Sequence, residues 1–435
     1  MQPSFYLKKY PFEEKPDYLL LYSIKRSSKA LLKKETYDSI LNGTLSPENE
    51  KMLSNLGMIV PDREEEKREV LGLLDKFNSK NTWLNISVIL NLDCNFDCVY
   101  CYEGEMKGKL YMDDKTAGLL VEFVKREFVK GKRSVNIDFY GGEPLLSTGL
   151  IKYISAGIRS FVGPRGGRYT FTLVTNGSLL KRGIAKGLVA LGLTGVKITV
   201  DGPPEVHNVS RPFRSGAGTF DTIIKNIKET ADLLKIRIGG NFQKGNFNEF
   251  PLLIDYLENE GLTPDKIYQL KFDAVMNRPK GEAAPADYVD GFMSVNEPWL
   301  ISAGTFLREK VMERGYSVPK ITPSPCQVEI KDAYVVNYDG LLYKCPVFIG
   351  KKDYEIGTLR AGVRDYSETY KLGNWKNKEC AECEYLPICF GGCRYMTYVR
   401  DGDIETTDCK KAYLDAVLET LIKQDIKYGQ GSATD

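Results

Sequence analysis

The chain has 435 residues, of which 42% are hydrophobic and 27% are charged, and its 60 Lys and Arg residues nearly balance 58 Asp and Glu residues. This length and composition predict two or three globular domains, and a net charge of +2 gives no overall attraction to nucleic acid or to anionic membranes. No segment reaches the roughly 18 consecutive apolar residues of a membrane-spanning helix, and the N-terminus lacks the apolar region of a signal peptide. We therefore expect a cytoplasmic protein without nucleic-acid or membrane partners.

Residues 1–82 are expected to form a small domain of short strands and helices. Its predicted elements are strands over 18–23 and 58–60, helices over 35–41 and 47–56, and a charged helix over 62–77. Ser46 is placed as the N-cap of the second helix, before Pro47, and Gly57 is placed to end that helix. The order of elements resembles a winged helix-turn-helix. A purely structural N-terminal domain is the alternative, and the nearly balanced charge of the region argues against DNA binding.

Strands and helices alternate in residues 83–320. We predict strands over 84–92, 134–140, 169–174, 196–200, 236–240 and 267–272, with amphipathic helices over 115–128, 150–161 and 219–234 between them. Six such units predict an α/β fold in which a parallel sheet is wound as a partial (β/α)6 barrel of the TIM type. Active sites in such folds lie at the carboxyl ends of the strands. Residues 276–320 are expected to form a bridge with a helix near 297–314.

Residues 321–435 contain seven of the ten cysteines, a predicted helix over 410–427 and a tail over 429–435 that is expected to fray. In a reducing cytosol, cysteines gathered in this way indicate metal or catalytic ligands, because disulfides are rare there. The chain has one histidine, His207, which excludes His-rich metal sites and argues against Ser-His or Cys-His catalysis. We expect His207 itself to be a structural loop or helix-cap residue.

Cys94, Cys98 and Cys101 follow the first predicted strand of the barrel region with the spacing CxxxCxxC. Three thiolates this close in the chain can hold a [4Fe–4S] cluster and leave its fourth iron without a protein ligand. A structural zinc site is the alternative, but such sites usually pair two short-spaced dyads, and no second dyad lies near residue 101. With Tyr100 before the last cysteine, the motif resembles that of the radical S-adenosylmethionine (SAM) enzymes. The resemblance implies that the open iron chelates SAM, whose cleavage yields a 5′-deoxyadenosyl radical that abstracts a hydrogen atom from the substrate.

Short polar motifs follow the next three predicted strands. Their residues are Gly141, Gly142, Glu143 and Pro144 after the second strand, Thr175 and Asn176 after the third, and Thr199, Asp201 and the later Arg211 after the fourth. They match the GGEP, TNG and SxDG motifs of the same family, with Thr199 keeping the hydroxyl of the usual Ser. The resemblance implies that Glu143 binds the amino group of SAM and that the others lie near its ribose and carboxylate. For each residue, turn formation alone is the alternative.

The later cysteines have the spacing Cx13Gx4C around Gly340, then Cx2Cx5Cx3C, then one more cysteine. They are Cys326, Cys345, Cys380, Cys383, Cys389, Cys393 and Cys409. The pattern resembles the SPASM domain, which carries auxiliary iron–sulfur clusters in radical SAM enzymes that modify peptides and proteins. Taken alone, the four cysteines from 380 to 393 would also fit a zinc ribbon.

The resemblance also implies a ligand set. An outer auxiliary cluster is held by Cys380, Cys383, Cys389 and Cys409, and an inner one by Cys326, Cys345 and Cys393, so that the protein carries three [4Fe–4S] clusters, one of them SAM-binding. Because two auxiliary clusters need eight thiolates and seven cysteines remain, one inner iron lacks a cysteine ligand. We hypothesise that this iron binds a substrate thiolate. Its occupation by Asp, Ser or water is the alternative.

Taken together, the sequence resembles a radical SAM/SPASM-domain maturase of ribosomally synthesised peptides, of the thioether-forming type. The resemblance implies an oxidoreductase that cross-links a precursor peptide, whose leader adds as a strand to the N-terminal domain, and an external reductant such as flavodoxin or ferredoxin. An anaerobic sulfatase-maturing, formylglycine-forming enzyme is one alternative, and an iron–sulfur electron-transfer protein without SAM chemistry is another. The sequence assigns no catalytic residue beyond the cluster ligands, and it identifies neither the peptide, the bond and its stereochemistry, nor the oligomeric state.

Overall fold

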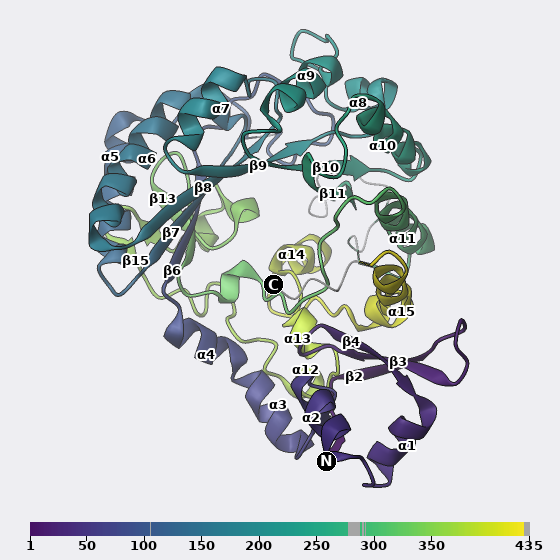
Figure 1. Ribbon diagram of the computed structural model, residues 1–435. Helices are drawn as coiled ribbons and strands as arrows, with labels where there is room; N and C mark the ends of the chain where they lie inside the picture. The colour runs from purple at the N-terminus through teal and green to yellow at the C-terminus, as the bar shows by residue number, and fades with distance from the viewer. Residues whose placement is uncertain (105, 277–287, 289–290, 292, 430–435) are drawn as a thin grey trace.

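The computed structural model describes residues 1–104, 106–276, 288, 291 and 293–429 (Figure 1). Most of the first half of the predicted bridge, and the predicted frayed tail from residue 430, lie outside these residues. The central feature is a mixed sheet of ten strands in the order β11-β10-β9-β8-β7-β6-β12-β13-β14-β15.

Six strands of this sheet run parallel and in chain order. They are β6 (Trp83–Ile89), β7 (Ser134–Tyr140), β8 (Arg168–Thr175), β9 (Leu193–Thr199), β10 (Lys235–Phe242) and β11 (Ile267–Ala274). All six predicted strands of this region are confirmed, with ends that differ by three residues at most. In Figure 1 the strands follow one another round an arc.

Side chains alternate along these strands between an apolar outer face and a polar inner face. On β7, for example, Val135, Ile137 and Phe139 are buried in the main core, whereas Asn136 and Asp138 point to the other side. The helices that cover the outer face are α5 (Asp114–Phe128), α6 (Thr148–Val162), α7 (Arg182–Val189), α8 (Pro204–Ser210), α9 (Phe220–Thr230) and α10 (Phe250–Asn259) (Figure 1). The polar face is thereby left free to line the interior of the arc.

The last region continues the same sheet. Strand β12 (Ala333–Val336) pairs in parallel with β6, and β13 (Leu341–Tyr343), β14 (Gly357–Thr358) and β15 (Gly362–Val363) extend it with antiparallel pairing. The helices of this half are α11 (Pro298–Glu313), α12 (Lys378–Ala381), α13 (Leu386–Cys389), α14 (Arg394–Asp401) and α15 (Lys411–Lys427). The predicted helices near 297–314 and over 410–427 are confirmed as α11 and α15.

The first region contains a separate antiparallel sheet of β2 (Leu7–Pro11), β3 (Tyr18–Ser23) and β4 (Ser28–Lys33), and a short pair formed by β1 (Gln2–Pro3) and β5 (Ile59–Val60). Its first two helices are α1 (Lys34–Leu41) and α2 (Pro47–Asn55). Ser46 is confirmed as an N-cap, because its side chain accepts a hydrogen bond from the backbone N–H of Asn49.

The single helix predicted over 62–77 is wrong. The structure has two helices, α3 (Arg63–Leu71) and α4 (Leu73–Lys80), that meet at Gly72, and Asp62 caps the first of them. Glycine disfavours a continuous helix because its backbone loses the most freedom there.

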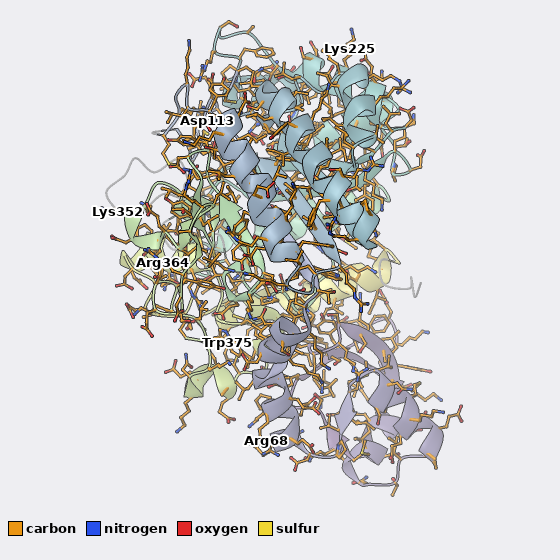
Figure 2. The ribbon with its side chains drawn as sticks, turned by 90° about the vertical axis from the view of Figure 1, so that its left-hand side faces the viewer. Arg68, Asp113, Lys225, Lys352, Arg364 and Trp375 are labelled. Carbon is orange, nitrogen blue, oxygen red and sulfur yellow. The ribbon has the colours of Figure 1, made fainter. Side chains whose placement is uncertain are left out.

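The first and last regions share an apolar core. Tyr22 and Leu20 of β3 pack with Leu418 and Ile422 of α15 and with Trp375. Figure 2 shows Trp375 between the part of the molecule that carries Arg68 and the part that carries Asp113 and Lys225. In the part of the chain that the structure describes, no helix is both long enough and apolar enough to cross a bilayer.

Candidate functional site

A cavity of about 450 Å³ lies at the carboxyl ends of the parallel strands. Nine residues predicted for a cofactor site line it: Cys94, Cys98, Cys101, Gly141, Gly142, Thr175, Asn176, Thr199 and Arg211. The other three, Glu143, Pro144 and Asp201, are buried behind its wall. The structure thus brings together segments that are more than a hundred residues apart in the chain.

Gly141 and Gly142 are needed because the loop after β7 touches the segment that precedes Cys94. A Cβ at Gly142 would lie 2.1 Å from the carbonyl oxygen of Asp93, and one at Gly141 would lie 2.3 Å from that of Asn91. The backbone N–H groups of Gly142 and Glu143 donate to the same two carbonyls, at 3.0 and 2.8 Å. The two glycines therefore let the loop after β7 support the cysteine loop directly.

Glu143 holds the rim of the cavity from behind. Its carboxylate accepts hydrogen bonds from the hydroxyl of Thr175 at 2.8 Å, from the backbone N–H of Asn176 at 2.8 Å and from that of Leu145 at 2.9 Å. Burial raises the pKa of Glu143, while these hydrogen bonds stabilise its charged form. In this structure the Glu143 carboxylate accepts hydrogen bonds from neighbouring protein groups, so its contact with the SAM amino group stays a prediction.

Tyr100 is the centre of a second buried network. Its hydroxyl donates to the Asp201 carboxylate and accepts from Arg211 Nη1 at 2.7 Å and from Asn241 Nδ2 at 3.0 Å. Tyr100, Arg211 and Asn241 line the cavity, whereas Asp201 lies behind it. Asp201 therefore orients the polar groups that face the cavity.

His207 is a structural residue of α8. Its Nδ1 accepts the backbone N–H of Asp201 at 3.0 Å, and its Nε2 lies 3.0 Å from the hydroxyl of Thr219. Burial, with a smaller contribution from the charge of Arg211, lowers the pKa of His207 to about 3, so the ring is neutral at physiological pH. The imidazole fixes the loop that carries Asp201.

Several residues of the cavity wall were not predicted. Tyr102 and Tyr140 bring their hydroxyls to 2.6 Å from each other, and Asn241, Lys197 and Lys271 come from the inner faces of β10, β9 and β11. The alternation of inner and outer positions near the strand ends is the sequence signal that could have found the strand residues.

The three cysteines of this cavity offer a donor set suited to a soft metal. Cys94 receives hydrogen bonds at sulfur from the backbone N–H of Phe96, at 3.4 Å, and from the amide of Asn176, at 3.7 Å. Burial raises the pKa of Cys94 to about 11. Among the described residues, no three His, Cys, Asp or Glu side chains converge closely enough to hold one metal ion. Three thiols around a shared cavity fit the larger body of a [4Fe–4S] cluster.

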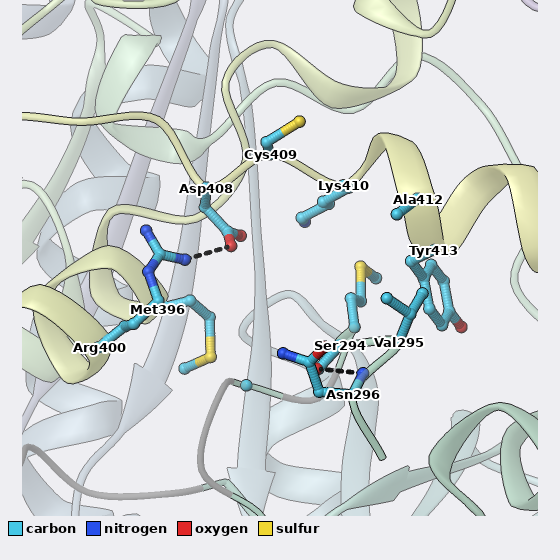
Figure 3. A pocket seen from close by; sticks show the side chains of 12 residues that line it. Ser294, Val295, Asn296, Met396, Arg400, Asp408, Cys409, Lys410, Ala412 and Tyr413 are labelled. Atoms are coloured by element: carbon cyan, nitrogen blue, oxygen red, sulfur yellow. Dashed lines mark hydrogen bonds and ion pairs between the residues drawn. The ribbon is translucent and has the colours of Figure 1, made fainter. Parts of the chain in front are cut away.

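A second cavity, also of about 450 Å³, is lined by Cys380, Cys383, Cys389 and Cys409, and Phe5 of the first region reaches it. Cys409 also borders a smaller cavity of about 210 Å³, where its sulfur points away from Met396 (Figure 3). These four cysteines are the ones predicted to hold the outer cluster.

The remaining three cysteines, Cys326, Cys345 and Cys393, form a third group beside the main core. Burial, followed by the proximity of the Cys326 and Cys393 sulfurs, raises the pKa of the Cys345 thiol. Ten cysteines thus fall into groups of three, four and three, which is the predicted partition; their roles as ligands stay predictions.

The model of the Radical SAM superfamily matches residues 88–241, which include the whole wall from Cys94 to Asn241. A probable GTP 3′,8-cyclase of Saccharolobus solfataricus is 31% identical over 319 residues, which are 69% of this chain and 92% of the relative. The chain belongs to the radical SAM superfamily. A cysteine-type anaerobic sulfatase-maturating enzyme of Clostridium novyi is 24% identical over 343 residues, 69% of this chain and 85% of the relative.

Two solved structures share the fold. One, described as native anSMEcpe with bound AdoMet and Kp18Cys peptide, has a TM-score of 0.63 and 17% identity and covers 80% of this chain and 99% of its own. The other, Streptococcus suis SuiB bound to S-adenosylmethionine, has a TM-score of 0.55 and 14% identity and covers 94% of this chain and 98% of its own. The protein is a radical SAM enzyme of the α/β type with a large mixed sheet.

Proposed function

We propose that this enzyme matures a ribosomally synthesised peptide by installing a thioether cross-link. The observation that carries the proposal is the partition of the cysteines into a group of three at the strand ends, a group of four, and a second group of three. Each group of three leaves one iron of a four-iron cluster without a cysteine from this chain.

The residues present fit a SAM-binding [4Fe–4S] cluster at the first cavity. Cys94, Cys98 and Cys101 would hold the cluster, and Thr199 and Arg211 line the same cavity, where they can orient the carboxylate of SAM. When bound, cluster and SAM together supply a 5′-deoxyadenosyl radical that abstracts hydrogen from substrate. The chain's own part is to hold the rim of the cavity rigid through the hydrogen bonds of Glu143 and Asp201.

The inner group of cysteines lies next to the interior of the sheet. Gln327, the neighbour of Cys326, lines a polar cavity of about 290 Å³ together with Ser87 and Asp138 of β6 and β7. A peptide thiolate that reached an inner iron from this interior would remain on the same face of the sheet as the first cavity. This arrangement supports the use of an open inner iron as the site of the substrate sulfur.

We divide the chain as the sequence predicted. Residues 1–82 would be a winged helix-turn-helix-like element that captures the leader peptide on its three-stranded sheet. Residues 83–320 would be the partial (β/α)6 barrel, and residues 321–435 a SPASM domain with the outer and inner clusters, which exchange electrons with a reductant such as flavodoxin or ferredoxin. The structural match to SuiB covers 94% of this chain, and SuiB has also been solved with its precursor peptide SuiA. Both facts support a role for the N-terminal region in binding a precursor peptide.

Formylglycine formation is the second candidate. The sulfatase-maturating relative and the anSMEcpe structure support it to a comparable degree. The first region, which carries the β2-β3-β4 sheet, and the missing eighth cysteine of the auxiliary set favour the thioether.

One experiment distinguishes the candidates. The reconstituted enzyme is incubated with SAM, dithionite and a synthetic cysteine-bearing peptide, and Cys98→Ala serves as control. We expect 5′-deoxyadenosine and a peptide that has lost two hydrogens and no longer reacts with iodoacetamide. A peptide that has lost its sulfur and reacts with a hydrazine would establish formylglycine formation instead, and no SAM cleavage by the wild type would exclude both.

A further inference from the structure

The inner faces of β9, β10 and β11 carry three cationic side chains, Lys197, Arg237 and Lys271, which we call the basic wall. Lys197 and Arg237 are direct partners in the pairing of β9 with β10, and Lys271 is the partner of Gly239 in the pairing of β10 with β11. Like charges at adjacent positions on one face of a sheet destabilise it. Three cations inside the arc of strands are therefore expected to have an anionic partner that offsets their repulsion.

Gly239 makes room for the basic wall. A Cβ at this position would lie 3.1 Å from Cε and 3.9 Å from Nζ of Lys197. The Lys197 side chain thus lies across Gly239, on the side where Lys271 begins. Both lysines line the cavity that contains Cys94, Cys98 and Cys101.

Two carboxylates offset part of this charge. Asp273 pairs with Lys271 at 2.7 Å, with both side chains about half exposed. Asp138 on β7 faces Lys197 and Arg237: burial raises its pKa, and the hydrogen bond from Thr172 and the two cations oppose that rise. Within the basic wall, three cations face two carboxylates, which leaves one positive charge in excess. Glu103 and Lys107, which also line the cavity, interact with each other and do not change this balance. Lys197 is exposed to the cavity and has no ion pair within 4 Å among the described residues.

SAM could supply the carboxylate that pairs with the basic wall, but Arg211 is better placed than Lys197 to bind the carboxylate of SAM. Arg211 lines the cavity together with Cys98, and the hydrogen bond from its Nη1 to the Tyr100 hydroxyl, at 2.7 Å, holds it there. The amino-acid end of SAM is expected beside the cluster, hence near Arg211. Lys197 precedes Thr199 by one inner position on β9 and lies deeper in the arc.

We propose that the basic wall binds a carboxylate of the peptide substrate, so that the enzyme prefers an acidic residue beside the residue it modifies. This inference rests on the proposed peptide-modifying function and adds the substrate class. Charge-assisted contacts of this kind are directional and strong enough to select between Glu and Gln.

The test uses two synthetic cysteine peptides that are identical except that Glu flanks the cysteine in one and Gln in the other. We expect the reconstituted wild type to bind the Glu peptide about tenfold more tightly by fluorescence anisotropy. Lys197→Gln and Lys271→Gln should remove most of that preference. Lys225→Gln, an exposed position on α9, should keep it and serves as the matched control.

Two further measurements show whether the basic wall binds the carboxylate of the peptide or that of SAM. SAM affinity should remain within about twofold in Lys197→Gln; an equal loss for SAM and peptide would mean that the wall binds the cofactor carboxylate and would overturn the proposal. Lys197→Glu should reverse the preference toward a Lys-flanked peptide. If the wild type cleaves SAM to 5′-deoxyadenosine yet binds both peptides equally, only this inference fails, whereas absence of SAM cleavage defeats the proposed function itself.

Discussion

The cavity at Cys94 and the cavity at Cys380 are alike in volume but are built in different ways. The first is supported by buried polar groups, since Glu143, Asp201 and His207 all lie behind its wall with no exposed surface. The second rests on aromatic and aliphatic packing between the two ends of the chain, in which Trp375 and Leu418 take part. The difference fits the roles proposed for the two cavities, because orienting a polar cofactor requires directional bonds, whereas conducting electrons requires mainly that the cluster is held in place.

The largest expected effect separates the chemical roles of the two cavities. Cys98→Ala should abolish SAM cleavage, because without this thiolate the cluster that binds SAM is lost. Cys380→Ala should leave SAM cleavage measurable while peptide modification falls at least about a hundredfold. The measurements are 5′-deoxyadenosine by chromatography and product by mass spectrometry. Equal losses of both activities in Cys380→Ala would show that the second cavity is needed for the first.

The second prediction concerns Glu143. In Glu143→Gln the amide oxygen can replace only one carboxylate oxygen, so the NH₂ group faces the backbone N–H of either Leu145 or Asn176, and a buried charge-assisted acceptor is lost. We expect about 3 kcal/mol less stability and at least tenfold weaker SAM binding. Urea unfolding and calorimetric titration with SAM measure the two effects. Glu122→Gln, an exposed change on α5, is the control, and a Glu143→Gln protein as stable as this control would contradict the assigned role.

The third prediction concerns the apolar contact between the two ends of the chain. Leu418 is fully buried against residues of the first region, so Leu418→Ala should lower the stability by about 2 kcal/mol. The loss should appear as faster hydrogen exchange in β3 and near Cys380, with SAM binding unchanged. Leu252→Ala, at an exposed position on α10, is the control. Weaker SAM binding in Leu418→Ala would mean that the two cavities are coupled.

The sequence predicts one part of this molecule well, because the relevant signals are local. The strand alternation located β6 to β11, and the spacing of Cys94, Cys98 and Cys101 located the first cavity. The helix predicted over 62–77 was wrong because Gly72 divides it into α3 and α4, and the pattern of charged and apolar residues does not reveal this break. Strands β2 and β4 were not predicted because neither shows a clear alternation of apolar and polar residues. In β2 (Leu7–Pro11) the two lysines are consecutive and so lie on both faces, and in β4 (Ser28–Lys33) lysines lie near both ends.

The supporting role of Glu143 and Asp201 could not be predicted from local signals. Both lie in motifs that the sequence linked to SAM, but Glu143 accepts hydrogen bonds from Thr175 and Asn176 at the end of β8, and Asp201 accepts from Tyr100 and Asn241. Such contacts join segments that only the tertiary fold brings together. The same reason explains why Lys197 and Lys271 were not recognised: they are 74 positions apart in the chain and meet only across β10.

The smallest expected effect tests the polar support of the first cavity through pH. The folded-state pKa of His207, about 3, lies below the ordinary value of 6.5, because the buried ring stays neutral. The unfolded chain therefore binds a proton between these values that the native protein does not, so stability falls as the pH is lowered through 6.5.

Between pH 6.5 and 5.5 this contribution should be about 1 kcal/mol, and His207→Asn, which keeps an acceptor near the backbone N–H of Asp201, should lack it. Urea unfolding of both proteins at the two pH values gives the difference directly. A wild-type protein whose stability changes with pH no more than that of His207→Asn would show that the ring is protonated in the folded state. In that case its nitrogen could not accept the Asp201 N–H, and the loop that orients Tyr100 and Arg211 would need another anchor.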